Sequence, residues 1–203
     1  MEVMISKKKL SWLYHLIIKR DIIGPIEKMK YGHIGNNTIL YKTSITDNEK
    51  LITIGDNTTI LRGTRLQLYT KQSNAAASIT IGNNCYIGYN NSFLAGGKII
   101  IEDNVLMASN ILISSENHSM DPEDKDYYMN QPLSCADVKI CEGTWIGEKV
   151  CILPGVTIGK KCIIGAASIV THSIPDYCIA AGNPARVIKQ YDFEQHKWIK
   201  VVK

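Results

Sequence analysis

Long apolar runs are missing from this chain. None of them reaches the roughly 20 residues that a membrane-spanning helix requires, so we do not expect the protein to cross a bilayer. An apolar stretch near the N-terminus is closed by Arg20 and Asp21, and no small-residue cleavage site follows it. A signal peptide is therefore not expected, and these absences together predict a cytoplasmic protein.

Closely spaced cysteines and a strong charge of one sign are missing too. The six cysteines include no C-x-x-C pair, whereas disulfide frameworks and structural zinc sites normally show tight spacing. The net charge of +4 is too small for the footprint of a nucleic-acid-binding protein. We therefore expect buried thiols, no required metal and no nucleic-acid partner.

The most informative feature that is present is a six-residue repeat. Aliphatic residues stand at every sixth position over six consecutive repeats: Ile140, Ile146, Ile152, Ile158, Ile164 and Val170. Four positions after the first five of these stand small or β-branched residues: Thr144, Val150, Val156, Cys162 and Ser168. On an α-helix this period would place successive aliphatic residues about 240° apart, which gives no apolar face. On short strands the small residue and the next aliphatic one are two apart, so both point inward.

The same unit recurs upstream, starting at Ile34, Ile54, Ile81 and Ile101. Between the strands stand Gly, Asn and Asp, which tolerate the backbone angles of tight corners. Three such hexads make one coil of a three-sided prism, and stacked coils bury each other's open faces. The repeat therefore predicts an all-β fold, a parallel β-helix that spans residues 31–185.

Three breaks interrupt the repeat. Nine extra residues lie between Leu66 and Ile81, and two lie between Phe93 and Ile101. The longest break is the polar segment 114–137. Insertions of this kind must leave the prism as loops, and loops are where functional residues concentrate, so we expect the function at the longest one.

The two ends of the chain lack the repeat. In residues 1–30, apolar residues follow helical spacing with lysines alongside: Leu10, Leu13, Tyr14 and Ile17. They predict an amphipathic helix that packs on the prism or on a neighbouring subunit, or that makes a peripheral contact with a membrane surface. The tail, residues 186–203, contains Phe193 and Trp198 and is predicted to form another short helix that covers the end of the solenoid.

Three segments of this chain resemble the hexapeptide-repeat acyltransferases: residues 81–118, 138–170 and 181–187. The similarity is strongest to the galactoside and maltose O-acetyltransferases and to polysaccharide O-acetyltransferases. The resemblance implies a left-handed β-helix, against the usual right-handed crossover rule. It also implies acetyl-CoA as the co-substrate and a homotrimer whose sites lie between subunits.

By this resemblance His118, in the loop that interrupts the coils, takes the place of the family's catalytic histidine. It would act as the general base that removes the proton of an acceptor hydroxyl, a role typical of histidine. A carboxylate or a carbonyl should orient its ring, and Glu116 and Asp121 are nearby candidates.

The resemblance further implies a groove between adjacent prisms for the pantetheine arm of acetyl-CoA. The groove would end at basic residues near the CoA phosphates, where a guanidinium group is well suited to phosphate. Its expected lining is Trp145, Gly147, Glu148, Ala166, Thr171, Arg186 and Lys189. His172 stands where the family often has lysine, which would make one phosphate contact weaker or pH-dependent.

On the acceptor side the chain departs from the family. The sugar O-acetyltransferases carry an asparagine and an aspartate where this chain has Gly88 and Gly96. The acceptor is therefore predicted to differ from simple galactosides or maltose. Aromatic rings and amides suit sugars, and these residues are the candidates to supply other contacts: Tyr89, Asn90, Asn91, Tyr127 and Tyr128.

These inferences favour O-acetylation of a hydroxyl on a sugar or glycan precursor. N-acetylation of an amino sugar and acetylation of a streptogramin-type antibiotic stay open, because the xenobiotic acetyltransferases share the loop and its histidine. A γ-type carbonic anhydrase would need three histidines around zinc, and the five here lack the close spacing: His15, His33, His118, His172 and His196. A non-catalytic β-helix scaffold is the remaining alternative.

Overall fold

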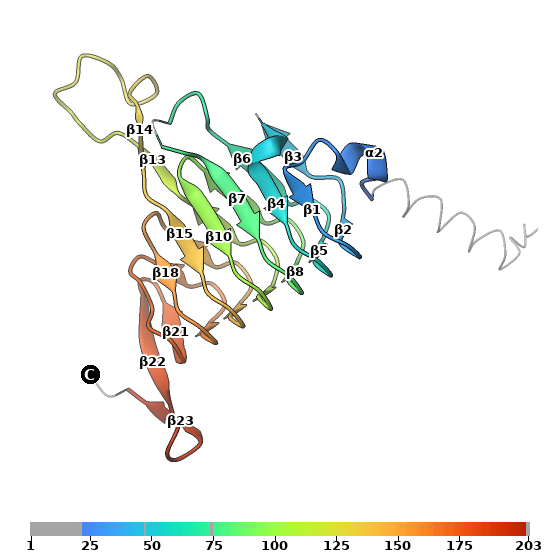
Figure 1. The fold of residues 1–203 in the computed structure, drawn as a ribbon. Helices are drawn as coiled ribbons and strands as arrows, with labels where there is room; N and C mark the ends of the chain where they lie inside the picture. Colours follow the sequence, from blue (N-terminus) through green and yellow to red (C-terminus); the bar gives the residue numbers. More distant parts are fainter. Residues whose placement is uncertain (1–21, 47, 74, 202–203) are drawn as a thin grey trace, which may run out of the picture.

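Three sheets, parallel throughout the coils, surround one buried core in the computed structural model, which describes residues 22–46, 48–73 and 75–201 (Figure 1). The chain runs through the sheets in turn, and each strand pairs with the strands one coil before and one coil after it. In this way Ile99 pairs with Ile79 on one side and with Val138 on the other. The all-β solenoid predicted from the repeat is confirmed.

The strands are short, as six-residue hexads require, and we number the three sheets I to III in chain order. Sheet I contains β1 (His33–Ile34), β4 (Ile52–Ile54), β7 (Ser78–Ile81), β10 (Lys98–Ile101), β15 (Val138–Ile140) and β18 (Thr157–Ile158). Sheet II contains β2 (Ile39–Leu40), β5 (Thr59–Ile60), β8 (Tyr86–Ile87), β11 (Leu106–Met107), β16 (Trp145–Ile146), β19 (Ile163–Ile164), β21 (Cys178–Gly182), β22 (Ala185–Asp192) and β23 (Lys197–Lys200). Sheet III contains β3 (Ser44–Thr46), β6 (Arg65–Leu68), β9 (Ser92–Ala95), β12 (Leu112–Ser114), β17 (Cys151–Ile152) and β20 (Ile169–Val170). Helical turns are confined in the described residues to α2 (Pro25–Lys28) and the 3-10 turn η1 (Glu49–Leu51).

The inward positions of the hexads form the core. All six aliphatic repeat residues from Ile140 to Val170 are essentially inaccessible to solvent, and so are the five small residues between them. Where the small residue is polar, its hydroxyl bridges two coils. Thr144 Oγ1 donates to Gly159 O at 2.8 Å and accepts from the backbone N–H of Cys162 at 3.2 Å. A buried hydroxyl is thus paired on both sides, which removes the cost of burying it.

Asparagine and glycine have different roles at the corners of the prism. Asn57, Asn84 and Asn104 take left-handed backbone angles, with φ of 54° to 59°, where one coil turns from sheet I to sheet II. The glycines before Asn57 and Asn84, which are Gly55 and Gly82, do not take such angles. A Cβ atom on Gly55 would lie 2.7 Å from the backbone of Gly82 in the next coil, so glycine is required there by the close stacking of coils.

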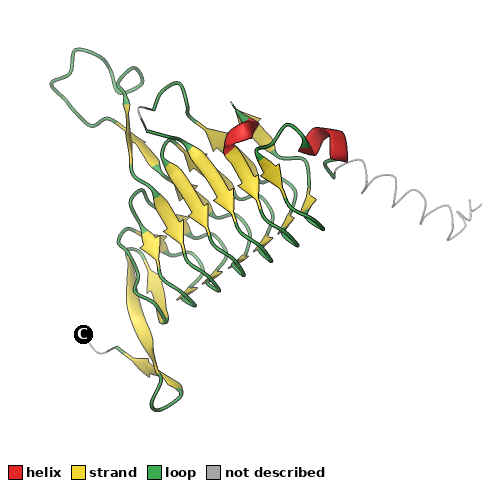
Figure 2. Ribbon diagram, viewed as in Figure 1, coloured by secondary structure: helices red, strands yellow, loops and turns green. Residues whose placement is uncertain are grey.

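All three breaks in the repeat emerge at the same edge of the prism, between sheets III and I (Figure 2). The segments involved are 69–77, 96–97 and 115–137, which connect strands of sheet III to the next strands of sheet I. We call this edge III–I, and we name the edges I–II and II–III in the same way. The prediction that insertions leave the prism as loops is confirmed, and the longest loop protrudes from this edge.

The C-terminal helix predicted for residues 186–203 is wrong. Strand β22 pairs antiparallel with β21, and β23 pairs antiparallel with β22, so the tail is a hairpin that extends sheet II. An uncovered last strand presents unpaired backbone groups, and the tail satisfies them. Aromatic rings then pack edge to face on the hairpin: Tyr177, Tyr191, Phe193 and Trp198.

The predicted N-terminal amphipathic helix falls mostly on residues outside the described part of the chain. Only α2, at Pro25–Lys28, lies within the described part of this segment. The described residues contain no helix that is both long enough and apolar enough to span a bilayer.

Candidate active site

A small antiparallel ladder carries the protruding loop. Strand β13 (Glu116–His118) leaves edge III–I and pairs with the returning strand β14 (Leu133–Cys135). His118 is the last residue of β13 and pairs with Leu133, so it stands where the ladder ends and the loop opens. The ladder is the structural reason that a histidine within a long polar segment has a defined position.

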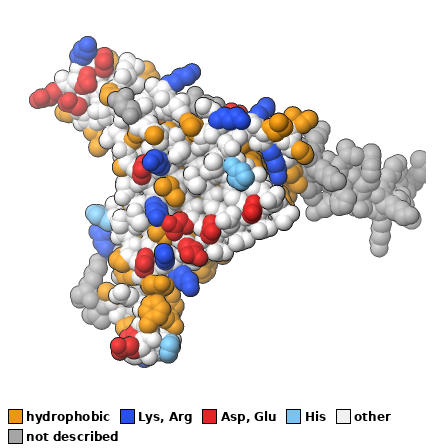
Figure 3. All heavy atoms as spheres, in the orientation of Figure 1, with side chains coloured by type: hydrophobic (Ala, Val, Ile, Leu, Met, Phe, Trp, Pro, Cys, Tyr) orange, Lys and Arg blue, Asp and Glu red, His pale blue; other side chains and the backbone are white. Residues whose placement is uncertain are grey.

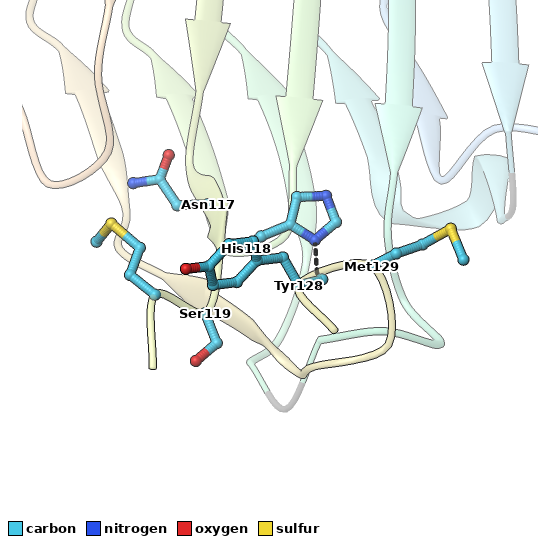
Figure 4. Close-up of a pocket in the computed structure, with 6 residues that line it drawn as sticks. Asn117, His118, Ser119, Tyr128 and Met129 are labelled. Carbon is cyan, nitrogen blue, oxygen red and sulfur yellow. Dashed lines mark hydrogen bonds between the residues drawn. The ribbon is translucent and has the colours of Figure 1, made fainter. Parts of the chain in front are cut away.

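One hydrogen bond defines the protonation pattern of His118. Its Nδ1 lies 3.0 Å from the carbonyl oxygen of Tyr128, on the returning arm of the loop (Figure 4). A carbonyl can only accept, so Nδ1 carries the hydrogen of this bond, and in the neutral ring Nε2 then has the free lone pair. The imidazole is exposed, and Nε2 is therefore the atom that can take a proton from another molecule.

The sequence left open whether a carboxylate or a carbonyl orients this ring. The structure gives the bond to the Tyr128 carbonyl and none to the two acidic candidates. Asp121 instead accepts the backbone N–H of Glu123 at 2.9 Å. The carbonyl of Glu116 accepts the hydroxyl of Ser114 at 2.7 Å. Every residue has a backbone carbonyl, so the sequence cannot indicate which carbonyl orients the ring. It can indicate only nearby acidic side chains, here Glu116 and Asp121.

His118 lies at an open hollow of about 780 Å³. Apolar and polar groups are mixed in its lining, which contains Asn117, His118, Ser119, Met120, Tyr128 and Met129. A surface that combines an aromatic ring, an amide and a hydroxyl suits a polyhydroxylated ligand. Of these residues, only His118 and Tyr128 were named from the sequence.

The tip of the loop is acidic (Figure 3). Four exposed carboxylate side chains and one exposed lysine lie within six residues: Asp121, Glu123, Asp124, Lys125 and Asp126. Elsewhere on the face shown, charges of both signs are present on sheet I, where Lys139 Nζ and Glu102 Oε1 form an ion pair at 2.7 Å. That lysine holds the pKa of Glu102 below its usual value. The loop tip thus carries an excess of negative charge.

The predicted CoA-groove residues fall mainly on sheet II and on edge II–III. Trp145 is on β16 with half of its side-chain surface exposed. Gly147 and Ala166 occupy successive coils at edge II–III, where a Cβ on Gly147 would lie 2.7 Å from the backbone N of Ala166. Glu148, at the same edge, accepts the N–H of Ser109 at 2.9 Å, and this bond is the main cause that lowers its pKa.

The remaining predicted groove residues divide between two places. Arg186 and Lys189 are exposed on β22, which continues sheet II beyond the last coil. Thr171 and His172 follow β20 at edge III–I, and their side chains lie 2.8 Å apart. Within one chain, His118 and most of the predicted groove are thus on different edges of the prism.

The acceptor candidates are also separated. Gly88 is buried at edge II–III, where a Cβ atom would lie 2.5 Å from the carbonyl oxygen of Ala108, and Tyr89 and Asn90 follow it there. Gly96 is buried at the foot of the loop, where a Cβ would lie 2.6 Å from that of Glu116. Tyr127 is exposed in the loop itself. The two glycines therefore leave no space for the longer polar side chains of the sugar O-acetyltransferases.

The part of the chain that the structure describes contains no group of three or more His, Cys, Asp or Glu residues that could hold a metal ion. All six cysteines are free thiols, and Cys85 and Cys162 occupy inward repeat positions as expected.

Comparison with known proteins gives a consistent picture. Residues 137–172 match the family model "Bacterial transferase hexapeptide (six repeats)". The chain is 31% identical over 159 residues to "Putative lipopolysaccharide biosynthesis O-acetyl transferase WbbJ" of Escherichia coli K12, a match that covers 75% of this chain and 79% of that protein. It is 38% identical over 125 residues to the galactoside O-acetyltransferase of the same organism, a match that covers 61% of this chain but only 60% of that relative's length.

Among solved structures, the N-acyltransferase AntD from Bacillus cereus, determined as a mutant in complex with dTDP and coenzyme A, shares the architecture. The TM-score is 0.70, with 23% identity, and the match covers 84% of this chain and 91% of that one. At this level of identity the likeness establishes the fold alone.

Proposed function

This chain belongs to the hexapeptide-repeat acetyltransferase family, and from that premise we propose that it transfers the acetyl group of acetyl-CoA to a hydroxyl group of a sugar or glycan precursor. We further propose that His118 is the general base. The observation that carries the proposal is the bond from Nδ1 of His118 to the Tyr128 carbonyl, because it leaves Nε2 of the neutral ring as a free base on a residue that lines the 780 Å³ hollow.

In the proposed reaction, Nε2 of His118 takes the proton of the acceptor hydroxyl as its oxygen bonds to the thioester carbonyl carbon. The carbon–sulfur bond then breaks, and the imidazolium returns the proton to the departing thiolate of CoA. Tyr128 keeps the imidazolium stable because its carbonyl accepts the Nδ1 hydrogen throughout. No net change in the protonation of the enzyme results.

We propose that the working unit is a homotrimer of left-handed coils with each site between two chains. Two observations support this assembly. His118 and most of the expected CoA groove are on different edges of one prism, so a second chain is needed to bring them together. The outer face of sheet II also carries exposed apolar side chains: Ile39, Tyr86, Leu106 and Trp145, each 41% to 49% exposed. Contiguous exposed apolar patches mark contact surfaces.

Within that assembly, the residues that we assign to acetyl-CoA are the ones expected from the sequence. Trp145, Gly147, Glu148 and Ala166 would line the pantetheine arm, and Thr171 and His172 would come from the loop-bearing edge. Arg186 and Lys189 would meet the phosphates, since both are exposed cations on β22 and a guanidinium can bind phosphate in a bidentate manner. We place the enzyme in the cytoplasm, where acetyl-CoA is made.

The test of the central claim is His118→Ala. Acetyl transfer should fall by about 10²- to 10⁴-fold, the usual contribution of a general base, while acetyl-CoA binding measured by calorimetry stays near normal. The matched control is His33→Ala, which removes an exposed histidine from β1 on a distant coil and should leave transfer unchanged. Full activity in His118→Ala, or loss of CoA binding with chemistry intact, would contradict the assigned role.

A second candidate is N-acetylation of an amino sugar, and the acidic loop tip is the observation that favours it. Four carboxylates in the loop that carries His118 would attract a cationic amine and repel a phosphorylated acceptor. Transfer assayed with sugars, amino sugars and streptogramins separates the candidates. Acetylation confined to amines would replace the O-acetyl assignment.

A further inference from the structure

The loop around His118 buries a single residue. From Glu116 to Asp137 every side chain is exposed or half-buried except Gln131, which is 5% exposed. A polar amide contributes little apolar contact, so a glutamine buried in an otherwise solvated loop has to be explained by its hydrogen bonds.

Those bonds connect two distant points of the loop. Gln131 Nε2 donates to the carbonyl of Asp126 at 2.7 Å and to the carbonyl of Asp121 at 3.1 Å. Carbonyl oxygens only accept, so the amide nitrogen has to face them and the orientation of the side chain is fixed. Its oxygen, Oε1, is buried without a hydrogen-bond partner among the described residues. The contacts that this side chain makes are therefore the two bonds that its nitrogen donates.

The backbone of Gln131 belongs to the turn that holds His118 in place. The N–H groups of Asn130 and Gln131 both donate to the carbonyl of Tyr127, at 2.7 and 3.3 Å, and close a turn from Tyr127 to Gln131. Tyr128 lies inside this turn, and its carbonyl accepts Nδ1 of His118 at 3.0 Å. The position of that carbonyl therefore depends on how the turn is fixed against the rest of the loop.

The other side-chain bonds of the loop do not supply this connection. Asp121 accepts from Glu123, and Asp124 accepts from Asp126, each only two residues away, so these bonds shape the tip without tying it to the returning arm. Apart from His118 itself, Gln131 is the residue between 116 and 137 whose side chain bonds across the loop in the described structure.

We propose that Gln131 is the positioning residue of the catalytic base. Its amide holds the tip and the returning arm together, which fixes the Tyr128 carbonyl and keeps His118 in the tautomer with the hydrogen on Nδ1. The proposal rests on the proposed function, since it assigns a reason for the geometry of that same base.

The variant that tests it is Gln131→Met, which keeps the length of the side chain and removes both donors. Turnover should fall by roughly 10- to 100-fold, because small displacements of a catalytic group are costly, while the KM for acetyl-CoA stays within about twofold. Gln131→Asn keeps the amide but is one methylene too short to reach both carbonyls, and an intermediate loss is expected. The matched control is Gln195→Met, which removes an exposed amide bonded to Asp192 on the C-terminal hairpin and should change nothing.

A spectroscopic measurement separates positioning from a merely structural effect. Long-range ¹H–¹⁵N correlation spectra of histidine-labelled protein report the tautomer, and His118→Ala identifies the signals. The native enzyme should show Nδ1–H for His118, and Gln131→Met should show a mixture with Nε2–H. Native turnover in Gln131→Met overturns the proposal, and so does a fall in turnover with an unchanged tautomer. The tautomer is measured without an activity assay. The failure of this proposal can therefore be distinguished from a failure of the general-base proposal, which is tested by His118→Ala in the transfer assay.

Discussion

At the scale of single residues, the buried thiols of the hexads make the protein sensitive to alkali. Cys162 occupies an inward repeat position, and burial raises the pKa of its thiol to about 11. Because the folded pKa exceeds the unfolded value of about 9, the folded state retains the proton longer than the unfolded chain does. The free energy of unfolding should therefore be unaffected by this group below pH 9 and should fall by up to about 2–3 kcal/mol as pH rises through 11.

Urea unfolding of the native protein and of Cys162→Val at pH 8, 9.5 and 11 measures this effect. Valine already occupies the equivalent repeat positions at Val150 and Val156, so the substitution suits the prism. The variant should lose less stability between pH 8 and 11 than the native chain. The residual dependence includes the other thiols whose pKa values burial also raises: Cys85, Cys141, Cys151 and Cys178. Identical pH dependence in the two proteins would contradict the assignment.

The sequence could predict the candidate base but not what holds it. His118 was identifiable because it interrupts a strict repeat and resembles a family motif. The group that orients it is a backbone carbonyl, at Tyr128, and backbone atoms carry no residue signature. Gln131 was missed for a related reason, since a glutamine in a polar segment looks solvated until the loop closes around it.

At the scale of the structural elements, the stacking distance of the coils decides where a side chain is tolerated. A Cβ on Gly147 would lie 2.7 Å from the backbone N of Ala166 and 2.8 Å from the carbonyl oxygen of Ile164, and neither atom can move without shifting a coil. Gly147→Ala should lower the free energy of unfolding by about 1–3 kcal/mol, the usual cost of overpacking. Gly24→Ala is the control, because nothing lies within 4 Å of a Cβ there, and it should change stability by about 0.5 kcal/mol or less. Denaturant unfolding measures both, and equal effects would refute the stacking argument.

The same distances explain which elements the sequence could predict. Each position of the hexad meets the same packing constraint in every coil. The repeat therefore predicts which residues form the strands, the corners and the core. The tail beyond Arg186 has no repeat, and its sparse apolar residues fit a helix as well as a strand. Its conformation is decided by the open edge of β21, which is a property of the folded prism and not of the tail.

At the scale of the whole molecule, the prism separates groups that the proposed reaction must combine. Edge III–I carries the loop with His118, and edge II–III carries Gly147, Glu148 and Ala166. A rigid solenoid cannot fold one edge onto another, so in the proposed assembly a neighbouring chain brings the two edges together. The repeat determines the coil but contains no information about which faces of two prisms meet, so only the family resemblance predicts an assembly.

The apolar row on sheet II makes this assembly testable. Leu106 is 46% exposed and pairs in register with Tyr86 on one side and Trp145 on the other. Leu106→Arg places a charge in the middle of that row and should dissociate the proposed trimer of 22.6 kDa chains into monomers, as measured by light scattering. Acetyl transfer should be lost in proportion, because in the proposed assembly each site is shared by two chains.

Thr157→Arg is the matched control for this substitution. It adds the same side chain to an exposed position on β18 of sheet I, outside the apolar row, and should leave both mass and transfer unchanged. An intact trimer in Leu106→Arg would show that another face joins the chains. A fully active monomer would have the wider consequence, because it would mean that His118 and the acetyl-CoA site come together within one prism and that the separation of edges does not constrain the chemistry.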